Sequence, residues 1–336
     1  MSSGVFEGLI REEDNKEIIE FGKSEDAALL AIIAPHVPYR VSPERVVSVE
    51  LGDAEEFAVE AFILRAKEIG VKKLYLLIHS PGGGVSSAYI IAKALRKNFE
   101  YLRVYVPQVA ASGATLIAIS GNEIIMGEIS RLSPIDVLMW SGDRIKSALA
   151  LLRSFYKLEE KYERTPPQDI PYPSRHLIES IDPEELERMT GILREVETYA
   201  MDLLTKAGYP SDKAKSIAEK LVYGFHSHYE VIDYEKAGKL GLNVKWYEDY
   251  REDWVKIKRW LGKYILARGI SYSSRGLCAP REVRVLGNKL LGPEEERILR
   301  RIRKWQEIEV KPKDLKKLIE ELKKPVATKI REKSLR

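Results

Sequence analysis

A single cysteine, Cys278, stands in this chain of 336 residues. An internal disulfide framework and a zinc site built from several cysteines are therefore both excluded, which fits a reducing compartment. The chain also lacks any run of eighteen apolar residues, and its first residues lack the charged-then-apolar pattern of a signal peptide. We therefore expect a cytoplasmic protein without a membrane span, with peripheral attachment to a membrane as the alternative.

A strong excess of charge of one sign is also lacking. The net charge is only +4, although 32% of the residues are charged, and acids and bases are interleaved. Such density favours a surface rich in ion pairs, as thermophile proteins often show. Lysines cluster between residues 311 and 324, but aromatic side chains for base stacking are sparse there. We interpret this segment as a solvated helix face, and we expect no nucleic-acid partner.

What the chain does have is a regular alternation of apolar runs and amphipathic segments. It predicts an α/β fold with a parallel sheet and right-handed crossovers. A strand buried on both faces is expected at Leu74–Ile78, where the apolar run is continuous. The other expected strands are 46–50, 102–106, 124–126 and 242–246. The expected helices are 53–69, capped by Asp53, then 86–97, 112–120, a helix starting at Asp182, and 234–240, closed by Gly241.

Three regions follow from this pattern. Residues 1–44 are an N-terminal extension with one short apolar segment, 45–246 form the α/β domain, and 247–336 form a basic, mostly helical extension. Helices are expected in the last region at 294–306 and 313–324. The proline-rich segment Thr165–Pro173 is expected to be an extended loop or lid, because prolines lack an N–H donor and restrict their neighbours. No internal repeat occurs.

A glycine-rich turn, Gly82-Gly83-Gly84, follows the strand at Leu74–Ile78. Glycine allows a backbone to approach a ligand closely and to leave N–H groups exposed for an anion. A phosphate loop is disfavoured, because Val85-Ser86-Ser87 replaces the Lys-Ser/Thr of a Walker motif and Ser87 replaces the third glycine of a dinucleotide motif.

A second turn, Ala110-Ala-Ser-Gly113, follows the next strand. Its serine, Ser112, has small neighbours that permit a sharp turn and leave room for a substrate carbonyl. The Gly113 N–H at the start of the following helix, together with that of Gly83, can stabilise a developing oxyanion. Both turns follow parallel strands and so are expected at the same sheet edge. The alternative is that Ser112 merely caps a closely packed helix.

A serine nucleophile needs a base, and the chain has five histidines. We expect His79 to brace the glycine turn, and His36 and His176 to be incidental. His226 and His228 flank Ser227, and such a pair on an extended segment could bind a metal, but no third ligand is placed by spacing. We expect no metal and no cofactor. Asp136, which follows a turn, could orient an imidazole.

Four ordered motifs resemble the archaeal serine dehydrogenase proteinase family, a branch of the Clp-protease/crotonase superfamily. They lie within roughly residues 45–245 and are Ile78-His-Ser-Pro-Gly-Gly83, Val106-Pro-Gln with Ser112-Gly-Ala-Thr-Leu-Ile-Ala118, Glu123-Ile-Ile-Met-Gly127 leading to Ser133-Pro-Ile-Asp136, and His228 before Ala237 and Leu240-Gly-Leu242. The resemblance implies a Clp/crotonase-like spiral of repeated β/α units with a C-terminal, mostly helical extension.

The resemblance also implies a catalytic triad in the chain order Ser112, Asp136, His228, with the N–H groups of Gly83 and Gly113 as the oxyanion hole. In Clp peptidases the base histidine follows the serine by about twenty-five residues, where this chain has Ile135. The base must therefore come from elsewhere, and His228 is our candidate.

These observations predict a Clp-like serine hydrolase, most simply an endopeptidase acting on a peptide or protein and forming a homo-oligomer, a trimer or a multiple of one. Three alternatives stay open. One is a catalytically inactive binding or assembly module. Another is a peptidase with a serine–lysine dyad, using Lys146 or Lys157, as related signal-peptide peptidases do. The last is a crotonase-like enzyme acting on acyl thioesters.

Overall fold

The structure is a computed structural model of the chain. It describes residues 27–33, 39–42, 45–47, 51–141, 144–180, 182–269 and 284–287. Cys278, His36 and the expected helices at 294–306 and 313–324 lie outside these residues.

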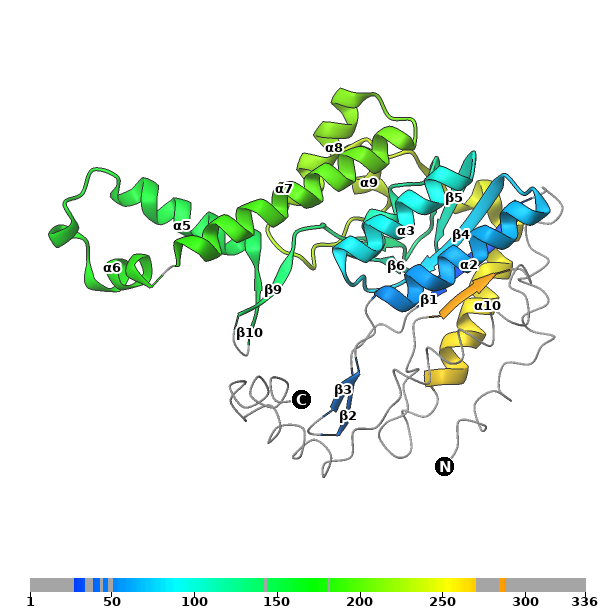
Figure 1. Cartoon of the computed structure of the whole chain (residues 1–336), viewed down its shortest axis with the longest axis horizontal. Helices are drawn as coiled ribbons and strands as arrows, with labels where there is room; N and C mark the ends of the chain where they lie inside the picture. Colours follow the sequence, from blue (N-terminus) through cyan, green and yellow to red (C-terminus); the bar gives the residue numbers. More distant parts are fainter. Residues whose placement is uncertain are drawn as a thin grey trace, which may run out of the picture. The chain divides into compact units, whose positions relative to one another are not determined.

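A six-stranded sheet forms the centre of the described chain (Figure 1). Its order is β11-β7-β5-β4-β1-β12, and all neighbours run parallel except β12, which is antiparallel to β1. The strands are β1 (Ala27–Ile33), β4 (Lys73–His79), β5 (Tyr101–Val106), β7 (Glu123–Met126), β11 (Val244–Trp246) and β12 (Arg284–Gly287). The predicted parallel sheet is confirmed, as is the fully buried strand, since every residue of β4 after Lys73 is buried.

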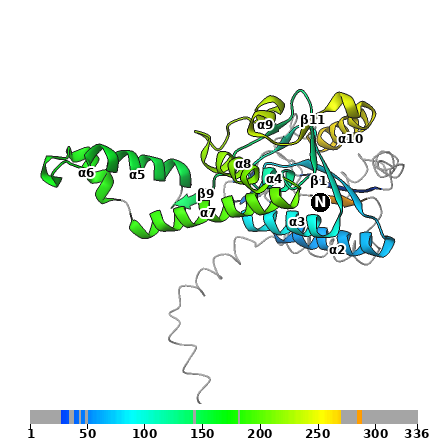
Figure 2. The ribbon, with the colours of Figure 1, turned by 90° about the horizontal axis from the view of Figure 1, so that it is seen from above.

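Helices cover both faces of this sheet. Figure 2 shows α2 (Asp53–Ile69) and α3 (Val85–Asn98) on one face and α10 (Arg251–Gly269) on the other. Alternate strand residues face each side, as the period of two in a strand requires. Those facing α10 form one apolar cluster with its side chains, including Tyr75, Leu77, Tyr105, Trp254, Ile257 and Trp260.

After β8 the chain leaves the edge of the sheet to form a helical arm, which consists of α5, α6 and the start of α7, and then returns to the sheet. A hairpin of β9 (Leu138–Ser141) and β10 (Arg144–Ser147) precedes α5 (Ala148–Tyr162). Figures 1 and 2 show α5, α6 (Tyr172–Glu179) and the start of α7 (Pro183–Lys206) beyond the edge of the sheet. The chain returns through α8 (Ser211–Tyr223) and α9 (Tyr234–Leu240). The smaller elements are β2 (Tyr39–Ser42), β3 (Arg45–Val47), β6 (Val109–Ala110), α4 (Gly113–Ala118), β8 (Arg131–Leu132), η3 (Pro167–Asp169) and η4 (Tyr247–Tyr250).

The sheet includes strands from outside the α/β domain predicted at residues 45–246. Strand β1 comes from the segment set apart as an N-terminal extension, and β12 and α10 come from the segment after residue 246. All seven residues of β1 are buried, because β4 and β12 flank it on either side. An apolar run of this length without polar alternation is typical of such an interior strand.

Three local expectations need correction. The segment Thr165–Pro173 is not simply extended, because it contains η3 and the start of α6, both with proline in the first turn, where its missing N–H costs nothing. The β9–β10 hairpin lies where the sequence pattern predicted no strand. Asp53 is the first helical residue rather than the cap: Gly52 takes the cap position, and its N–H donates to the Glu55 carboxylate over 2.9 Å.

A buried ion pair stabilises the face of the sheet that α10 covers. Arg103 Nε donates to Glu123 Oε1 over 2.5 Å, and the two side chains are 13% and 11% exposed. The Tyr101 hydroxyl donates to the same carboxylate, and the Arg103 guanidinium lies 4.7 Å from the ring centres of both Tyr75 and Tyr250. The pair therefore connects strands β4, β5 and β7 to the segment that leads into α10.

Replacing Glu123 with glutamine is expected to lower the free energy of unfolding by about 2 kcal/mol at neutral pH, because the charged hydrogen bond between Glu123 and Arg103 is then replaced by a weaker one to a neutral amide. Burial alone would raise the pKa of Glu123, but hydrogen bonds from Tyr101 and Arg103 hold it below its ordinary value. A carboxyl whose pKa is lowered by folding stabilises above its unfolded pKa, and that stability is lost as pH falls through the folded value. The difference in free energy of unfolding between Glu123→Gln and wild type should therefore become smaller at acid pH.

Urea denaturation at pH 7 and at pH 3 measures both effects. The matched control is Glu68→Gln, which removes the exposed pair with Arg65 and should change stability by less than about 0.5 kcal/mol. Equal effects of the two substitutions at pH 7 would contradict the stabilising role of the buried pair.

Candidate active site

Four chain segments meet at the carboxyl end of the sheet through a ladder of short backbone pairings. Ser80 pairs with Ala110, Ala110 with Leu132, and Leu132 with Ile232. Every one of these links carries hydrogen bonds, for example Ala111 N to Ser80 O over 3.0 Å and Leu132 N to Ile232 O over 2.9 Å. The ladder therefore brings together the glycine turn, the serine turn, the loop before Asp136 and the loop that carries His228.

The glycine turn is packed tightly against its surroundings. Gly83 has φ +151°, and an added Cβ there would lie 2.0 Å from the Leu51 nitrogen. Gly82 has φ +107°, and its added Cβ would lie 2.9 Å from Ser112 Cβ and 3.0 Å from the Gly113 nitrogen. Side chains at either position would thus push the glycine turn away from Leu51 or from the serine turn. This close approach is the reason for glycine here.

Ser112 lies in a strained turn between β6 and α4. Its φ of 51° and ψ of −121° make it the one non-glycine residue with positive φ among those the structure describes. Its N–H donates to Ser133 Oγ over 2.7 Å, which holds the turn in place. Its side chain does not cap α4. Ser112 thus takes the N-cap position of α4 without the side-chain hydrogen bond of a cap. Its strained backbone is of the kind found where a side chain is held for function.

Two backbone N–H groups close to Ser112 have no acceptor. Neither Gly83 nor Gly113 donates a backbone hydrogen bond to any residue in the described part of the chain. The Gly113 N–H opens α4, and an added Cβ on Gly113 would lie 3.5 Å from the Gly83 nitrogen. The two donors are thus close neighbours, an arrangement that suits an anionic oxygen.

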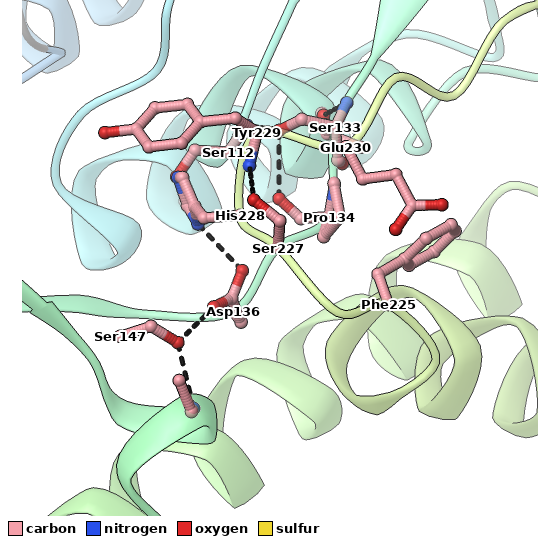
Figure 3. Close-up of polar contacts among 12 residues, drawn as sticks. Ser112, Ser133, Pro134, Asp136, Ser147, Phe225, Ser227, His228, Tyr229 and Glu230 are labelled. Atoms are coloured by element: carbon pink, nitrogen blue, oxygen red, sulfur yellow. Dashed lines mark hydrogen bonds and ion pairs between the residues drawn. The ribbon is translucent and has the colours of Figure 1, made fainter.

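Asp136 and His228, 92 residues apart in sequence, meet at this edge. His228 Nδ1 lies 2.8 Å from Asp136 Oδ1, and the side chains are 10% and 4% exposed. Figure 3 shows the imidazole between Asp136 and the Ser112 turn. Ser112 Oγ itself makes no hydrogen bond within the described residues. Catalytic hydrogen bonds are often long in the absence of substrate.

Neighbouring side chains hold this pair in position. The Ser147 hydroxyl donates to Asp136 Oδ2 over 2.8 Å and also accepts from Ala150 N at the start of α5 (Figure 3). Arg153, one turn further along α5, donates to the carbonyl oxygens of Tyr223 and Phe225, at the end of α8 and just before His228. Helix α5 therefore contributes to the placement of both the carboxylate and the histidine loop.

A cavity of about 200 Å³ opens beside His228. Ala111 and Ser133, from the serine turn and the following loop, lie in its wall together with His228. The remaining lining residues are Pro81, Val109, Arg131, Leu132, Tyr229, Glu230 and Val231. A substrate placed in this cavity would lie against both the serine turn and the imidazole.

The other candidates lie apart from this cavity. Lys157 is exposed on α5 and Lys146 is partly exposed on β10, and neither belongs to the cavity wall. His79 ends β4 and is buried, His176 stacks on Tyr172 in α6, and His226 is exposed. Within the described residues no group of three histidine, cysteine or carboxylate side chains is placed to hold a metal.

Sequence reasoning missed the supporting roles of Ser133, Ser147 and Arg153. Ser147 begins a helix, and the pattern of a helix start was visible, but its contact with Asp136 depends on the unexpected β9–β10 hairpin. Arg153 gave no signal, because nothing in a sequence shows which carbonyl groups an arginine will meet after folding.

Comparison with known protein families shows which family the chain belongs to. Residues 49–250, more than half of it, match the family described as ClpP-like SDH-type serine proteinase. The chain belongs to this family. The resemblance inferred from the four motifs is confirmed, and so is the Clp-like α/β fold.

Two curated relatives of this chain come from Methanocaldococcus jannaschii, and both are uncharacterized proteins. MJ0137 is 31% identical over 183 residues, 52% of this chain and 54% of its own length. MJ1495 is 28% identical over 169 residues, 50% of this chain and 51% of its own. The chain thus spans about half the length of the curated relatives it matches.

Solved structures similar to this chain include a variant of the 1510-N membrane-bound stomatin-specific protease, at 15% identity and a TM-score of 0.39, covering 62% of this chain and 79% of that one. A Pseudomonas malonate decarboxylase hetero-tetramer in complex with coenzyme A is 19% identical with a TM-score of 0.26, covering 55% and 77%. None of the helices described for this chain is long and apolar enough to cross a membrane.

Proposed function

We propose that this chain is a serine peptidase that uses Ser112 as nucleophile, His228 as base and Asp136 as the carboxylate that orients the base. The observation that carries the proposal is the 2.8 Å contact between His228 Nδ1 and Asp136 Oδ1 beside the Ser112 turn. Family membership supports the reaction class.

The proposed roles follow from the hydrogen bonds. A proton on His228 Nδ1, donated to Asp136, leaves Nε2 as a free base that takes the proton of Ser112 as its Oγ attacks the scissile carbonyl. Asp136 then stabilises the imidazolium, and Ser147 holds the second oxygen of that carboxylate. The imidazolium returns its proton to the leaving amine, and water hydrolyses the acyl-enzyme by the same steps.

The proposed oxyanion hole is the pair of N–H groups of Gly83 and Gly113. Negative charge develops on the carbonyl oxygen during attack, and a donor that is already in place stabilises it without reorganisation. Each such donor typically contributes about 3 kcal/mol to lowering the barrier. The free state of both N–H groups and the start of α4 at Gly113 support this assignment.

The serine–lysine alternative has weaker support. Lys157 is exposed and Lys146 is partly exposed on the hairpin, and neither lines the cavity that His228 lines. A lysine base works as a neutral amine, which requires burial or a neighbouring cation to lower its pKa. A histidine base needs no such environment, because the ordinary pKa of an imidazole lies close to neutrality.

A fluorophosphonate probe tests the proposal directly. The intact protein should form a covalent adduct at Ser112, which peptide mapping by mass spectrometry locates. Ser112→Ala should abolish labelling, and His228→Gln should slow it by at least about a hundredfold, because the serine then lacks its base. Labelling that is unchanged in His228→Gln but lost in Lys146→Met or Lys157→Met would replace the histidine with a lysine base. A folded protein without any adduct would favour the inactive binding module.

The wider assignments remain predictions. We propose a peptide or protein as substrate, a homo-oligomer that is a trimer or a multiple of one, and a cytoplasmic location. Reaction with an acyl thioester is tested by thermal shift with coenzyme A, where the absence of a shift at millimolar ligand would argue against that alternative.

A further inference from the structure

The wall of the cavity beside His228 contains one cation, Arg131. The backbone of this residue is fixed, since Arg131 pairs with Val109 in the β6–β8 ladder and its N–H donates to Gln108 O over 2.8 Å. The residue is partly buried, and within the part of the chain that the structure describes it takes part in no ion pair. A fixed, partly buried guanidinium without a counter-charge is available to bind an anion.

The position of Arg131 in its strand relates it to the nucleophile. Strand β8 ends at Leu132, and Ser133, the next residue, accepts a hydrogen bond from the Ser112 N–H. Arg131 and Ser133 both lie in the wall of the cavity beside His228. The Arg131 side chain is thus within reach of a substrate acylating Ser112.

The other charged groups around the cavity are compensated. The Glu230 carboxylate lies 3.6 Å from Lys236 Nζ and also accepts the His226 N–H. The Asp136 carboxylate is bound to His228 and Ser147. The remaining uncompensated charge on the described wall is the positive charge of Arg131. The cavity should therefore favour a substrate that brings a negative charge.

We propose that Arg131 is a specificity-determining residue that binds a carboxylate of the substrate next to the scissile bond. The carboxylate is either an aspartate or glutamate side chain or the α-carboxylate of a chain end, because both offer two oxygens to the guanidinium fork. This inference rests on the proposed peptidase function of the same site. It adds a preference for acidic substrates that family membership does not provide.

Cleavage-site profiling of a proteome-derived peptide library tests the preference. Wild type should enrich acidic residues roughly tenfold at one position beside the cleaved bond, which corresponds to about 1.4 kcal/mol from a charge-assisted hydrogen bond to the guanidinium. Arg131→Gln should remove the enrichment, and Arg131→Glu should shift it to lysine and arginine. The matched control is Arg188→Gln, an exposed arginine on α7, which should leave the profile unchanged. An enrichment that persists in Arg131→Gln overturns the proposal.

Two further arms separate the possible outcomes. Peptides with an internal glutamate, an internal glutamine, a free C-terminal carboxylate or a C-terminal amide distinguish the two sources of the carboxylate. Binding of the same peptides to Ser112→Ala, followed by fluorescence polarisation, needs no catalysis. If fluorophosphonate labelling fails, the peptidase proposal fails, but a glutamate preference in binding that Arg131→Gln abolishes still supports the anion site. If labelling succeeds and neither preference depends on Arg131, the anion site alone is wrong.

Discussion

Replacing Asp136 with asparagine is expected to reduce kcat by about 10⁴-fold with little change in KM. The amide can donate to His228 Nδ1, which then keeps its proton on Nε2, the atom that must accept the serine proton. The imidazolium formed during attack also loses the carboxylate that stabilises it. Steady-state kinetics on any peptide that wild type cleaves, together with thermal unfolding, separates lost chemistry from lost stability.

Two further variants serve as comparisons for Asp136→Asn. Asp182→Asn makes the same chemical change at the N-cap of α7, where asparagine caps as well as aspartate, and should leave activity unchanged. Ser147→Ala removes one donor to Asp136 and should cost roughly tenfold in kcat. If Asp136→Asn reduces kcat by less than Ser147→Ala does, Asp136 does not orient the base.

Gly83→Ala is expected to destabilise the protein by about 3 kcal/mol or more and to abolish activity. The new methyl group would lie 2.0 Å from the Leu51 nitrogen and 2.6 Å from the Leu51 oxygen, both backbone atoms that cannot move aside cheaply. Relief of this clash requires the glycine turn to move, which displaces the proposed oxyanion donor. Thermal unfolding and fluorophosphonate labelling measure the two effects.

Gly70→Ala is the matched control, because it separates the clash from the cost of backbone conformation. Gly70 also has positive φ, +81°, at the end of α2, but an added Cβ there meets no atom within 4 Å. Its substitution should cost only about 1 kcal/mol, the strain of a left-handed residue with a side chain, and should leave labelling intact. Comparable losses in the two variants would show that backbone strain, rather than the contact with Leu51, explains the effect at Gly83.

The parallel sheet was predictable because its central strands are continuous apolar runs separated by amphipathic helices. Helix α9 was predicted with both its ends, since Asp233 and Gly241 are strong start and stop signals. Strand β1 was noticed only as an apolar segment. Its partners, β4 and β12, lie far from it in sequence, and no local signal identifies a strand's neighbours.

The candidate site was predictable where a turn needs particular residues and unpredictable where it depends on distant contacts. The glycines and Ser112 stand out because few other residues tolerate their backbone angles or their close packing. The contact between Asp136 and His228 was an expectation from family resemblance, since 92 residues and the whole helical arm separate them. Arg131 drew no attention, because its proposed role depends on having no ion-pair partner among the described residues, which a sequence does not show.

The ladder through Ser80, Ala110, Leu132 and Ile232 has a consequence for how the site forms during folding. Its first links join segments within about thirty residues of each other, whereas the last one spans a hundred residues and closes a loop that includes α5 to α8. Contacts of such long sequence separation form late, because the entropy of closing the loop is lost before the contact stabilises it. We therefore expect the proposed nucleophile and its proposed oxyanion donors to come together before the proposed base, His228, joins them. Until this last contact forms, the proposed serine nucleophile lacks its proposed base, so we expect hydrolytic activity to appear only after it has formed.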